Sequence, residues 1–573
     1  MSQVNTPLLG QENGIPGYPC YRTVEETYAS MDTLVANYPN LVSKVDIGDS
    51  WDKMTPGGPS GYDLFVLVLT NNSRPSTGKA RFFLMAEIHA REYTTAETAM
   101  RYAEYLTANY GTNPDITWML DYNEVHILVM SNPDGRKFAE TVEWWRKNTN
   151  NTNGCTTLGY YGTYLNRNSS FHWGTAGTDP CGETYQGPVI GSEPETQAMQ
   201  NYVANIFIDQ RGPGDTDPAP LTATGMFVTL HSFADVNIFP WGWTSAQAPN
   251  YTQMNTLGRK LGYFNGYEVC QSNSDCMYET HGTSDDWAYG TLGIAAYTVE
   301  MGSQFFETCS NFTTNVWPKN RDMLVYAIKA ARLPYMNPGG PDATTLALSV
   351  SPVQGEPVTL TAKADDTCYY SGGHGNEPTY PIAEARYSID SPSWAAGATT
   401  YPMTPSDGAF DRNVENIQAT IETTGLSVGR HIIFVEAKVA QDKWGSPTAI
   451  FLDVYPFALT PPTAGGQAYG GDSATYNLNV ANIGSVADTY TVTFTNSNGW
   501  AVVAPATVGP VAAGANADFQ VTVPIPAGYF GGVADVTTVT LTSGGPVHTA
   551  QSTTLTTTTL YHYFYLPAIG KGE

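Results

Sequence analysis

Positive charge is scarce in this sequence. Among its 573 residues, 27 are Lys or Arg and 53 are Asp or Glu, which gives a net charge of −26. Charged residues of both signs make up only 14% of the chain, against about 25% in an average globular protein. A chain this acidic lacks the general basic surface that attracts nucleic acid or an anionic membrane. We therefore expect neither partner, and the composition favours an extracellular protein.

The sequence also lacks a membrane segment and a secretory signal. No stretch of about 18 apolar residues is present to span a bilayer. The first residues show no basic stretch followed by an apolar core, which is the pattern of a signal peptide. If the protein is secreted, as we expect, its signal has been removed.

Paired-cysteine motifs are missing as well. None of the seven cysteines forms a Cys-x-x-Cys pair, so redox and zinc-ribbon functions have no support. Two or three disulfides in an oxidising compartment are compatible with the pattern. Spacing does not fix connectivity, but we favour Cys155–Cys181 and Cys270–Cys276, which leaves Cys368 as the odd thiol. The alternative is a set of buried, reduced cysteines.

Apolar periodicity predicts an α/β domain in the first part of the chain. Capping-box sequence motifs begin at Thr23, Thr94 and Ser192, and the last has Pro194 in its first helical turn. Between the helical patterns lie apolar runs of strand length. Strands that alternate with helices favour a mostly parallel or mixed sheet. The four clearest runs are Phe82–Ile88, Val125–Met130, Phe227–Leu230 and Ile294–Val299.

The pattern changes after a linker rich in Pro and Gly at residues 334–341. Beyond it apolar residues alternate with period two, as in Tyr476, Leu478 and Val480, which predicts two β-sandwich modules. No Lys or Arg occurs between Lys443 and Lys571. The predicted organisation is an extension (1–17), an α/β domain (18–336), two sandwich modules (342–456 and 457–560) and a C-terminal tail (561–573).

Candidate metal ligands stand at the ends of the predicted strands. His89 follows the run at residues 82–88, Glu92 comes three residues later, His231 follows the run at 227–230, and Glu300 follows the run at 294–299. Ligands of open α/β sheets bind at the carboxyl ends of the strands. Imidazole nitrogen and carboxylate oxygen both suit zinc. A His-x-x-Glu motif alone is weak evidence, but further candidate residues at the ends of other strands of the same sheet edge favour a site.

Several motifs follow one another in order along the first part of the chain. They are His89-Ala-Arg-Glu92, Asn132-Pro-Asp-Gly135, Trp145-Arg-Lys-Asn148, Asn166-Arg-Asn168, Ser192-Glu-Pro-Glu195, His231-Ser232, Gly282-Thr-Ser-Asp-Asp-Trp287 and Thr298-Val-Glu300. In these motifs the sequence resembles the zinc carboxypeptidases of the carboxypeptidase A and B type, over roughly residues 18–335, including secreted bacterial members. The resemblance implies a mixed, eight-stranded sheet flanked by helices, and the last module resembles immunoglobulin-like repeats.

The resemblance implies a chemistry for five of these positions. His89, Glu92 and His231 would bind one zinc ion. Glu300 would be the general base for a zinc-activated water, which attacks the C-terminal peptide bond. Arg146 would stabilise the oxyanion that forms on the scissile carbonyl.

It also implies a binding site for the substrate. Asn166 and Arg167 would bind the terminal carboxylate, and Tyr278 would close over the substrate. Arg91 would be a secondary carboxylate contact. The position that floors the side-chain pocket aligns with Asp285, which predicts a preference for basic or mixed C-terminal residues. The alternative is that Asp285 points to solvent.

One position departs from the family pattern. The family usually has an aspartate two residues before the Asn-Arg pair, where it accepts a hydrogen bond from the first zinc histidine. Here that position is Tyr164. Loss of such a carboxylate typically costs about 10–100-fold in metal affinity or activity. We expect an effect on rate and zinc affinity, unless the Tyr164 hydroxyl or another residue substitutes.

The sequence thus predicts a secreted zinc metallocarboxypeptidase that acts on the C-termini of peptides or proteins, as a monomer. Two rivals remain open: a zinc amidase or cell-wall peptide hydrolase on the same scaffold, and a catalytically degenerate binding or adhesion protein. The candidate ligands of the β modules are a cell surface, a carbohydrate or a protein.

Overall fold

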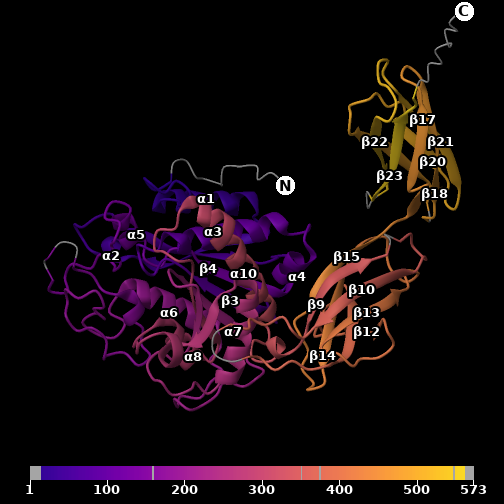
Figure 1. The fold of residues 1–573 in the computed structure, drawn as a ribbon. Coiled ribbons are helices and arrows are strands. Elements are labelled where there is room, and N and C mark those ends of the chain that lie inside the picture. Colours follow the sequence, from indigo (N-terminus) through magenta and orange to yellow (C-terminus); the bar gives the residue numbers. More distant parts are fainter. Residues whose placement is uncertain are drawn as a thin grey trace, which may run out of the picture.

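Three parts follow one another along the chain (Figure 1). The structure, a computed structural model, describes residues 14–155, 157, 160–349, 352–372, 376–484, 486–545 and 549–561, apart from the side chains of residues 275 and 276. An α/β part comes first, and two all-β parts follow. Most of the predicted extension and nearly all of the predicted tail lie outside the described residues.

A mixed sheet of eight strands forms the centre of the α/β part, in the order β1-β2-β4-β3-β5-β8-β6-β7. Its four middle strands, β4, β3, β5 and β8, are parallel to one another. Their carboxyl ends therefore meet at one edge of the sheet. The strands are β1 (Val42–Asp49), β2 (Asp63–Leu69), β3 (Ala80–Met85), β4 (Asn123–Leu128), β5 (Met226–His231), β6 (Val236–Phe239), β7 (Glu268–Gln271) and β8 (Ala295–Glu300).

The four strands expected from apolar runs are β3, β4, β5 and β8, and the predicted α/β class is confirmed. Every residue of these four strands is buried except Arg81 of β3 and Glu300 of β8, because helices cover the sheet. The predicted run at residues 82–88 extends too far, since β3 ends at Met85. Glu87 has a φ of 59°, which turns the chain away from the sheet.

Helices pack against the sheet and against one another, with α10 lying against α3 and α7. No helix among the described residues is long and apolar enough to cross a membrane. The helices are α1 (Val24–Asn37), α2 (Trp51–Met54), α3 (Tyr93–Asn109), α4 (Pro114–Tyr122), α5 (Pro133–Ala139), η1 (Leu165–Arg167), α6 (Pro194–Ile206), α7 (Tyr251–Asn265), η2 (Ser272–Cys276), α8 (Ser284–Leu292), α9 (Cys309–Asn311), η3 (Phe312–Val316), α10 (Trp317–Ala330) and η4 (Asn337–Gly339).

One of the three predicted capping boxes forms. The side chains of Thr23 and Glu26 cap the start of α1 reciprocally. The box at Thr94 is wrong, because α3 has already begun at Tyr93. The box at Ser192 is wrong as well, because the N-cap of α6 is Glu193 and Ser192 donates to its carboxylate. Pro194 does occupy the first turn of α6, as expected.

The first all-β part packs directly on the α/β part. Phe434 belongs to the same buried apolar cluster as the α/β core, and its ring centroid lies 6.2 Å from that of Trp118 in α4. The buried ammonium of Lys260 in α7 lies 2.6 Å from Asp342. The predicted linker is packed rather than exposed: Tyr335 is buried, and its hydroxyl donates to the carbonyl of Gly293.

This first all-β part contains seven strands in the order β15-β14-β11-β12-β13-β10-β9. β12 pairs with β13 through only two residue pairs. The strand set therefore folds over at β12 and encloses a single apolar cluster. The strands are β9 (Asp342–Leu348), β10 (Val358–Asp365), β11 (Ile382–Ile389), β12 (Thr400–Pro405), β13 (Val414–Ile421), β14 (Gly429–Val439) and β15 (Thr448–Val454).

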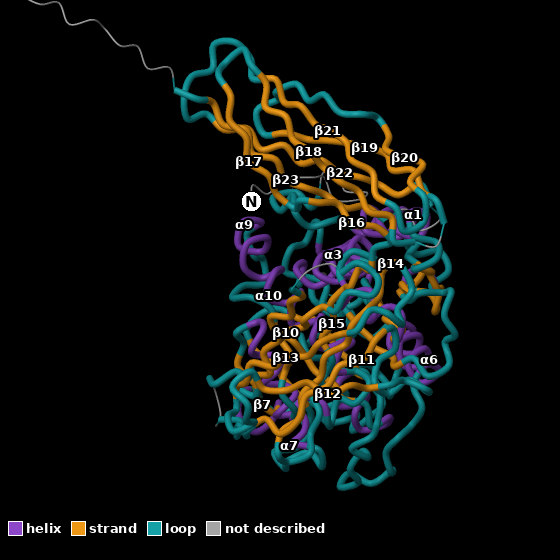
Figure 2. Tube along the Cα trace, turned by 90° about the vertical axis from the view of Figure 1, so that its right-hand side faces the viewer, coloured by secondary structure: helices purple, strands orange, loops and turns teal. Residues whose placement is uncertain are grey.

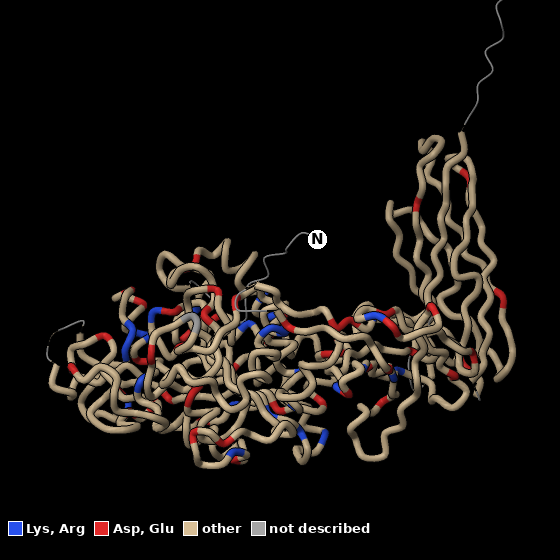
Figure 3. Tube along the Cα trace, turned by 60° about the horizontal axis from the view of Figure 1, so that its bottom comes forward, with Lys and Arg blue, Asp and Glu red and all other residues tan. Residues whose placement is uncertain are grey.

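The second all-β part has two sheets around one apolar cluster, which is a sandwich. Every regular element among the described residues after Gly339 is a strand (Figure 2). Figure 3 shows acidic but no basic residues along this part, in line with the sequence. Its strands are β16 (Phe457–Thr460), β17 (Thr463–Ala468), β18 (Ser473–Asn482), β19 (Asp488–Asn496), β20 (Thr507–Val511), β21 (Asn516–Pro524), β22 (Ala534–Ser543) and β23 (Ala550–Thr559).

Disulfides tie distant segments of the α/β part together. The expected bond between Cys155 and Cys181 is present, and Cys368 is a buried free thiol, as expected. The Cys270–Cys276 pair lies outside the described residues, because the side chain of Cys276 is not described. A bond that we did not predict joins Cys20 to Cys309, which are 289 residues apart in the sequence.

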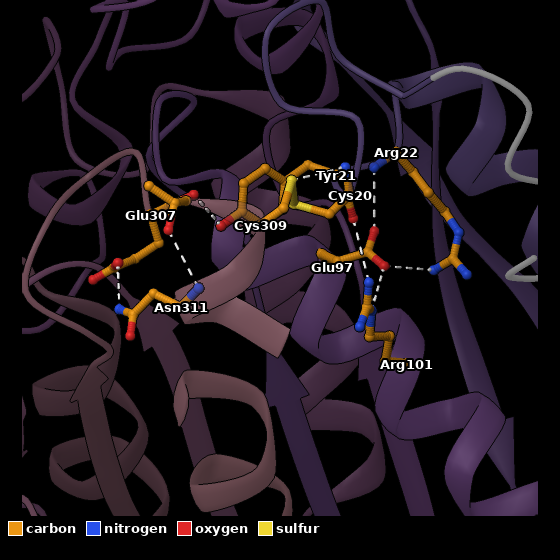
Figure 4. Close-up of a disulfide and its surroundings, with 9 residues drawn as sticks. Cys20, Tyr21, Arg22, Glu97, Arg101, Glu307, Cys309 and Asn311 are labelled. Carbon is orange, nitrogen blue, oxygen red and sulfur yellow. Dashed lines mark hydrogen bonds and ion pairs between the residues drawn. A yellow bond between two sulfur atoms is a disulfide. The ribbon is translucent and has the colours of Figure 1, made fainter. Parts of the chain in front are cut away.

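Figure 4 shows how the Cys20–Cys309 bond is embedded. Arg22, two residues after Cys20, forms an ion pair of 3.4 Å with Glu97 in α3. The carboxylate of Glu97 also binds Arg101 at 2.7 Å. The bond and these ion pairs fix the N-terminal segment against α3 and against the segment that follows β8.

The long Cys20–Cys309 loop leads to a stability prediction. We expect the Cys20→Ala/Cys309→Ala variant to lose about 2–5 kcal/mol of unfolding free energy, because its unfolded chain is no longer restricted by the disulfide and gains conformational entropy. A matched control is Cys155→Ala/Cys181→Ala, whose loop spans only 26 residues. In the chain-entropy treatment its loss is smaller by about 2 kcal/mol. Urea midpoints of the transition of the α/β part would measure both, and equal losses would contradict the prediction.

Candidate metal centre

Three elements deliver the candidate ligands to the carboxyl edge of the central strands. His231 is the last residue of β5, and His89 lies in the segment that leaves β3. Glu92 is the N-cap residue of α3, yet its side chain makes no capping hydrogen bond. The side chain of Glu92 is turned toward the two histidines instead. A residue at a helix-capping position therefore forms part of the site.

The three side chains converge closely. Nδ1 of His89 lies 2.7 Å from Oε1 of Glu92 and 3.0 Å from Nδ1 of His231. Nδ1 of His231 lies 3.4 Å from Oε2 of Glu92. The candidate ligand atoms of all three lie within 4.8 Å of one another. Among the described residues this is the one group of three or more His, Cys, Asp and Glu side chains that could hold a metal ion.

Burial sets the charge of the site. All three residues are at most 2% exposed. Burial lowers the pKa of His89 well below its ordinary value, so this imidazole is neutral. Burial alone would raise the pKa of Glu92, but the two histidines lower it, so the carboxylate is ionised. The backbone N–H of Ser232 also donates to Oε2 of Glu92, at 3.1 Å.

This set of donor atoms fits zinc. Two imidazole nitrogens and a carboxylate facing one another are the three protein ligands of many catalytic zinc sites. When Nδ1 of a histidine binds a metal, its Nε2 carries the proton and needs an acceptor. For His231 that acceptor is present, since Oγ1 of Thr229 lies 3.2 Å from Nε2. Nε2 of His89 is buried and has no hydrogen-bond partner among the described residues.

Glu300 lies beside these ligands because of strand register. It ends β8 and is paired with His231 of β5. Burial raises the pKa of Glu300 above its ordinary value. A carboxylate with a raised pKa, next to a metal site, can take up and release a proton near neutral pH.

Arg146 also contacts Glu92. Its Nη1 is 3.2 Å from Oε1 of Glu92, and its Nη2 donates to the hydroxyl of Tyr164 at 2.5 Å. The guanidinium lies 4.7 Å above the ring of Tyr164. Arg146, which was predicted to stabilise the oxyanion, is thus in direct contact with Tyr164, the residue that differs from the family pattern.

Asn166 and Arg167 lie in the short helix η1. Oδ1 of Asn166 accepts hydrogen bonds from the backbone N–H and the hydroxyl of Ser284, which links η1 to the start of α8. Nη1 of Arg167 donates to the carbonyl of Asn166 at 2.7 Å. Nη2 of Arg167 donates to the hydroxyl of Tyr278 at 3.3 Å. Tyr278 is 59% exposed, so it reaches over Arg167 from the surface.

The two remaining predicted residues lie at different depths. Asp285 is buried in the first turn of α8, where Thr298 and the backbone N–H of Asp286 donate to its carboxylate. It does not point to solvent, so that alternative is wrong. Arg91 lines the cleft over the site, with its guanidinium 4.4 Å from the ring of Phe305.

The cleft has a volume of about 350 Å³, and some of its walls were not predicted. Phe233 and Phe305 contribute aromatic walls, and Glu183 contributes a carboxylate. No strand-end or spacing pattern marks Phe305 or Glu183. Phe233 alone had a signal, since it lies two residues after His231 on the chain segment that leaves β5.

Comparison with known proteins identifies the family. The family profile described as zinc carboxypeptidase matches residues 27–322, just over half of the chain. This chain belongs to the zinc carboxypeptidase family.

Individual relatives are moderately similar. The chain is 32% identical over 295 residues to carboxypeptidase A2 of Rattus norvegicus, which covers 50% of this chain and 63% of that protein. It is 27% identical over 304 residues to a zinc carboxypeptidase of Saccharothrix mutabilis subsp. capreolus, which covers 52% of this chain and 65% of that protein. The chain thus spans somewhat less than two thirds of the length of these relatives.

Solved structures include distant matches. The crystal structure of thrombin-activatable fibrinolysis inhibitor matches with a TM-score of 0.46 and 22% identity, over 55% of this chain and 74% of that chain. The carboxypeptidase A of Helicoverpa armigera matches with a TM-score of 0.45 and 20% identity, over 55% of this chain and 74% of that chain.

Proposed function

We propose that this chain is a zinc-dependent metallocarboxypeptidase, which removes single residues from the C-termini of peptides or proteins. The observation that carries the proposal is that the His89–Glu92–His231 set lies at a cleft, which Glu92 lines together with Glu300, Arg146 and Arg91. Membership of the zinc carboxypeptidase family supports it. Zinc held by the three ligands would supply Lewis-acid chemistry, lowering the pKa of water to about 7 and polarising a carbonyl.

Glu300 would act as the general base. Its carboxylate takes the proton of the attacking water and later gives it to the leaving amine, which requires a group that titrates near the working pH. Burial raises its pKa in that direction. Arg146 would bind the oxygen of the scissile carbonyl as negative charge develops on it, because its guanidinium is held beside Glu92.

Exopeptidase specificity would come from Arg167, with Asn166 and Tyr278. A planar guanidinium binds a carboxylate in a two-pronged fit. The contact between Arg167 and the exposed Tyr278 supports a role for the tyrosine in covering the substrate. Arg91, at the rim of the cleft, would be a secondary contact for carboxylates along the approach.

The remaining features of the proposal concern the whole molecule. We propose a secreted monomer, in line with the disulfides and the acidic composition. The two all-β parts would be sandwich modules with boundaries near residues 342–456 and 457–560, the second of immunoglobulin-like type. Their ligands would be a cell surface, a carbohydrate or a protein.

A matched pair of substrates tests this function. We expect the chain to hydrolyse a peptide with a free C-terminus, and to lose on the order of 100-fold in kcat/KM for the same peptide amidated, because Arg167 then has no carboxylate to bind. A chelator should abolish the activity and zinc should restore it. Equal cleavage of both peptides would favour the amidase, and zinc-independent or absent turnover would contradict the proposal.

Glu300→Gln tests the base. The amide cannot accept the proton of water, so we expect kcat to fall by about 100- to 10,000-fold. Zinc content, measured by atomic absorption, should stay at one ion per chain, since Glu300 is not a ligand. A variant that retained wild-type turnover would show that another group is the base.

Asp285 leads to a prediction about specificity. We propose that its buried carboxylate selects Arg and Lys at the C-terminus, or both basic and apolar residues. In matched peptides, Asp285→Asn should lower kcat/KM for C-terminal Arg and Lys by about 10–100-fold, because a buried ion pair is lost. Release of Phe and Leu should change less than about twofold. A clear preference of the wild type for Phe would contradict this proposal.

A further inference from the structure

Tyr164 occupies the position where the family pattern would place a carboxylate, and its contacts point to a different role. We propose that Tyr164 is a positioning residue for Arg146: it holds the guanidinium in place for the developing oxyanion and does not orient the metal histidine. This inference rests on the proposed peptidase function and deepens it.

The first support is the way in which Arg146 is held. Nη2 of Arg146 donates to the Tyr164 hydroxyl at 2.5 Å, and Nη1 lies 3.2 Å from Oε1 of Glu92. The guanidinium also lies 4.7 Å above the Tyr164 ring. Two nitrogens fixed at separate points, and one face on a ring, leave the group little freedom to turn. A charge-assisted hydrogen bond and a cation–π contact act on the same group.

The second support is that the tyrosine contacts both site arginines. The guanidinium of Arg167 lies 4.7 Å from the centre of the same ring. One side chain thus sets the places of the group proposed for the oxyanion and the group proposed for the terminal carboxylate. A tyrosine is neutral, so it positions both cations and leaves their charge available to the substrate. A carboxylate at this position would cancel part of that charge.

The third support is what Tyr164 does not do. Its ring lies against His89, with the ring centres 5.0 Å apart, but Nε2 of His89 has no hydrogen-bond partner among the described residues. The hydroxyl, which could have replaced the carboxylate as acceptor, is used by Arg146 instead. The side chain at this position therefore orients Arg146 and not His89.

Tyr164 is itself rigidly held, as a positioning residue must be. Its side chain is 2% exposed. Its backbone N–H donates to the carbonyl of Tyr185 at 2.7 Å, and it is the N-cap residue of η1, which carries Asn166 and Arg167. Fixed backbone and buried ring together define where the hydroxyl can lie.

The first test is Tyr164→Phe, which removes the hydroxyl and keeps the ring. We expect kcat to fall about tenfold, the size of one hydrogen bond to a charged group. KM should change less than twofold, since Arg167 keeps its ring contact. Zinc affinity, from competition with a chelator, should also change less than twofold. The matched control is Tyr102→Phe, because the Tyr102 hydroxyl is buried without a partner among the described residues, and we expect it to leave kcat unchanged.

A double-mutant cycle shows whether the effect passes through Arg146. In an Arg146→Gln background, Tyr164→Phe should produce no further loss of kcat.

The outcomes separate this inference from the proposed function. A wild type without zinc-dependent turnover would overturn both. An active wild type whose kcat is unchanged in Tyr164→Phe would overturn this inference alone. So would a Tyr164→Phe variant that binds zinc tenfold more weakly, because the tyrosine would then act on His89. A full tenfold loss in the Arg146→Gln background would also overturn it.

Discussion

The candidate site depends on how the charge of one buried carboxylate is compensated, that of Glu92 at the start of α3. A charge removed from water is tolerated only where several groups compensate it. Here the partners are the two imidazoles, the guanidinium of Arg146 and the backbone N–H of Ser232. They come from the ends of β3 and β5 and from the segment before η1. A single buried oxygen pair therefore fixes the relative positions of elements that are far apart in the sequence.

The sheet supplies the geometry that this carboxylate requires. Four parallel strands end at one edge, and register pairs His231 with Glu300. The residues that follow β8 continue to Cys309, whose bond to Cys20 fixes that segment against α3. Phe305, which forms one wall of the cleft, lies within this segment. The disulfide and its neighbouring ion pairs thus stabilise a part of the cleft that no strand supports.

The sequence indicated where the candidate ligands lie, because the ends of strands can be recognised from apolar runs. An apolar run that stops at His231 or Glu300 marks the edge of a sheet, and the α/β class followed from several such runs. Contacts between distant segments could not be predicted in the same way. The Cys20–Cys309 bond depends on where two loops meet, and Tyr164 could equally have faced His89. The Thr94 capping box was wrong because Glu92, a candidate ligand, is already the N-cap residue of the helix.

Basic residues are scarce in this chain, so the partners of the arginines near the candidate site are informative. Many arginines of the α/β part pair with carboxylates, as Arg136 does with Glu87 at 2.8 Å and Arg146 with Glu92 at 3.2 Å. Arg91 and Arg167 have no such partner among the described residues, and both lie against aromatic rings. An aromatic ring attracts a cation without neutralising it. No carboxylate in the part of the chain that the structure describes neutralises the charge of these two arginines, which would leave it available to the substrate carboxylate that we propose.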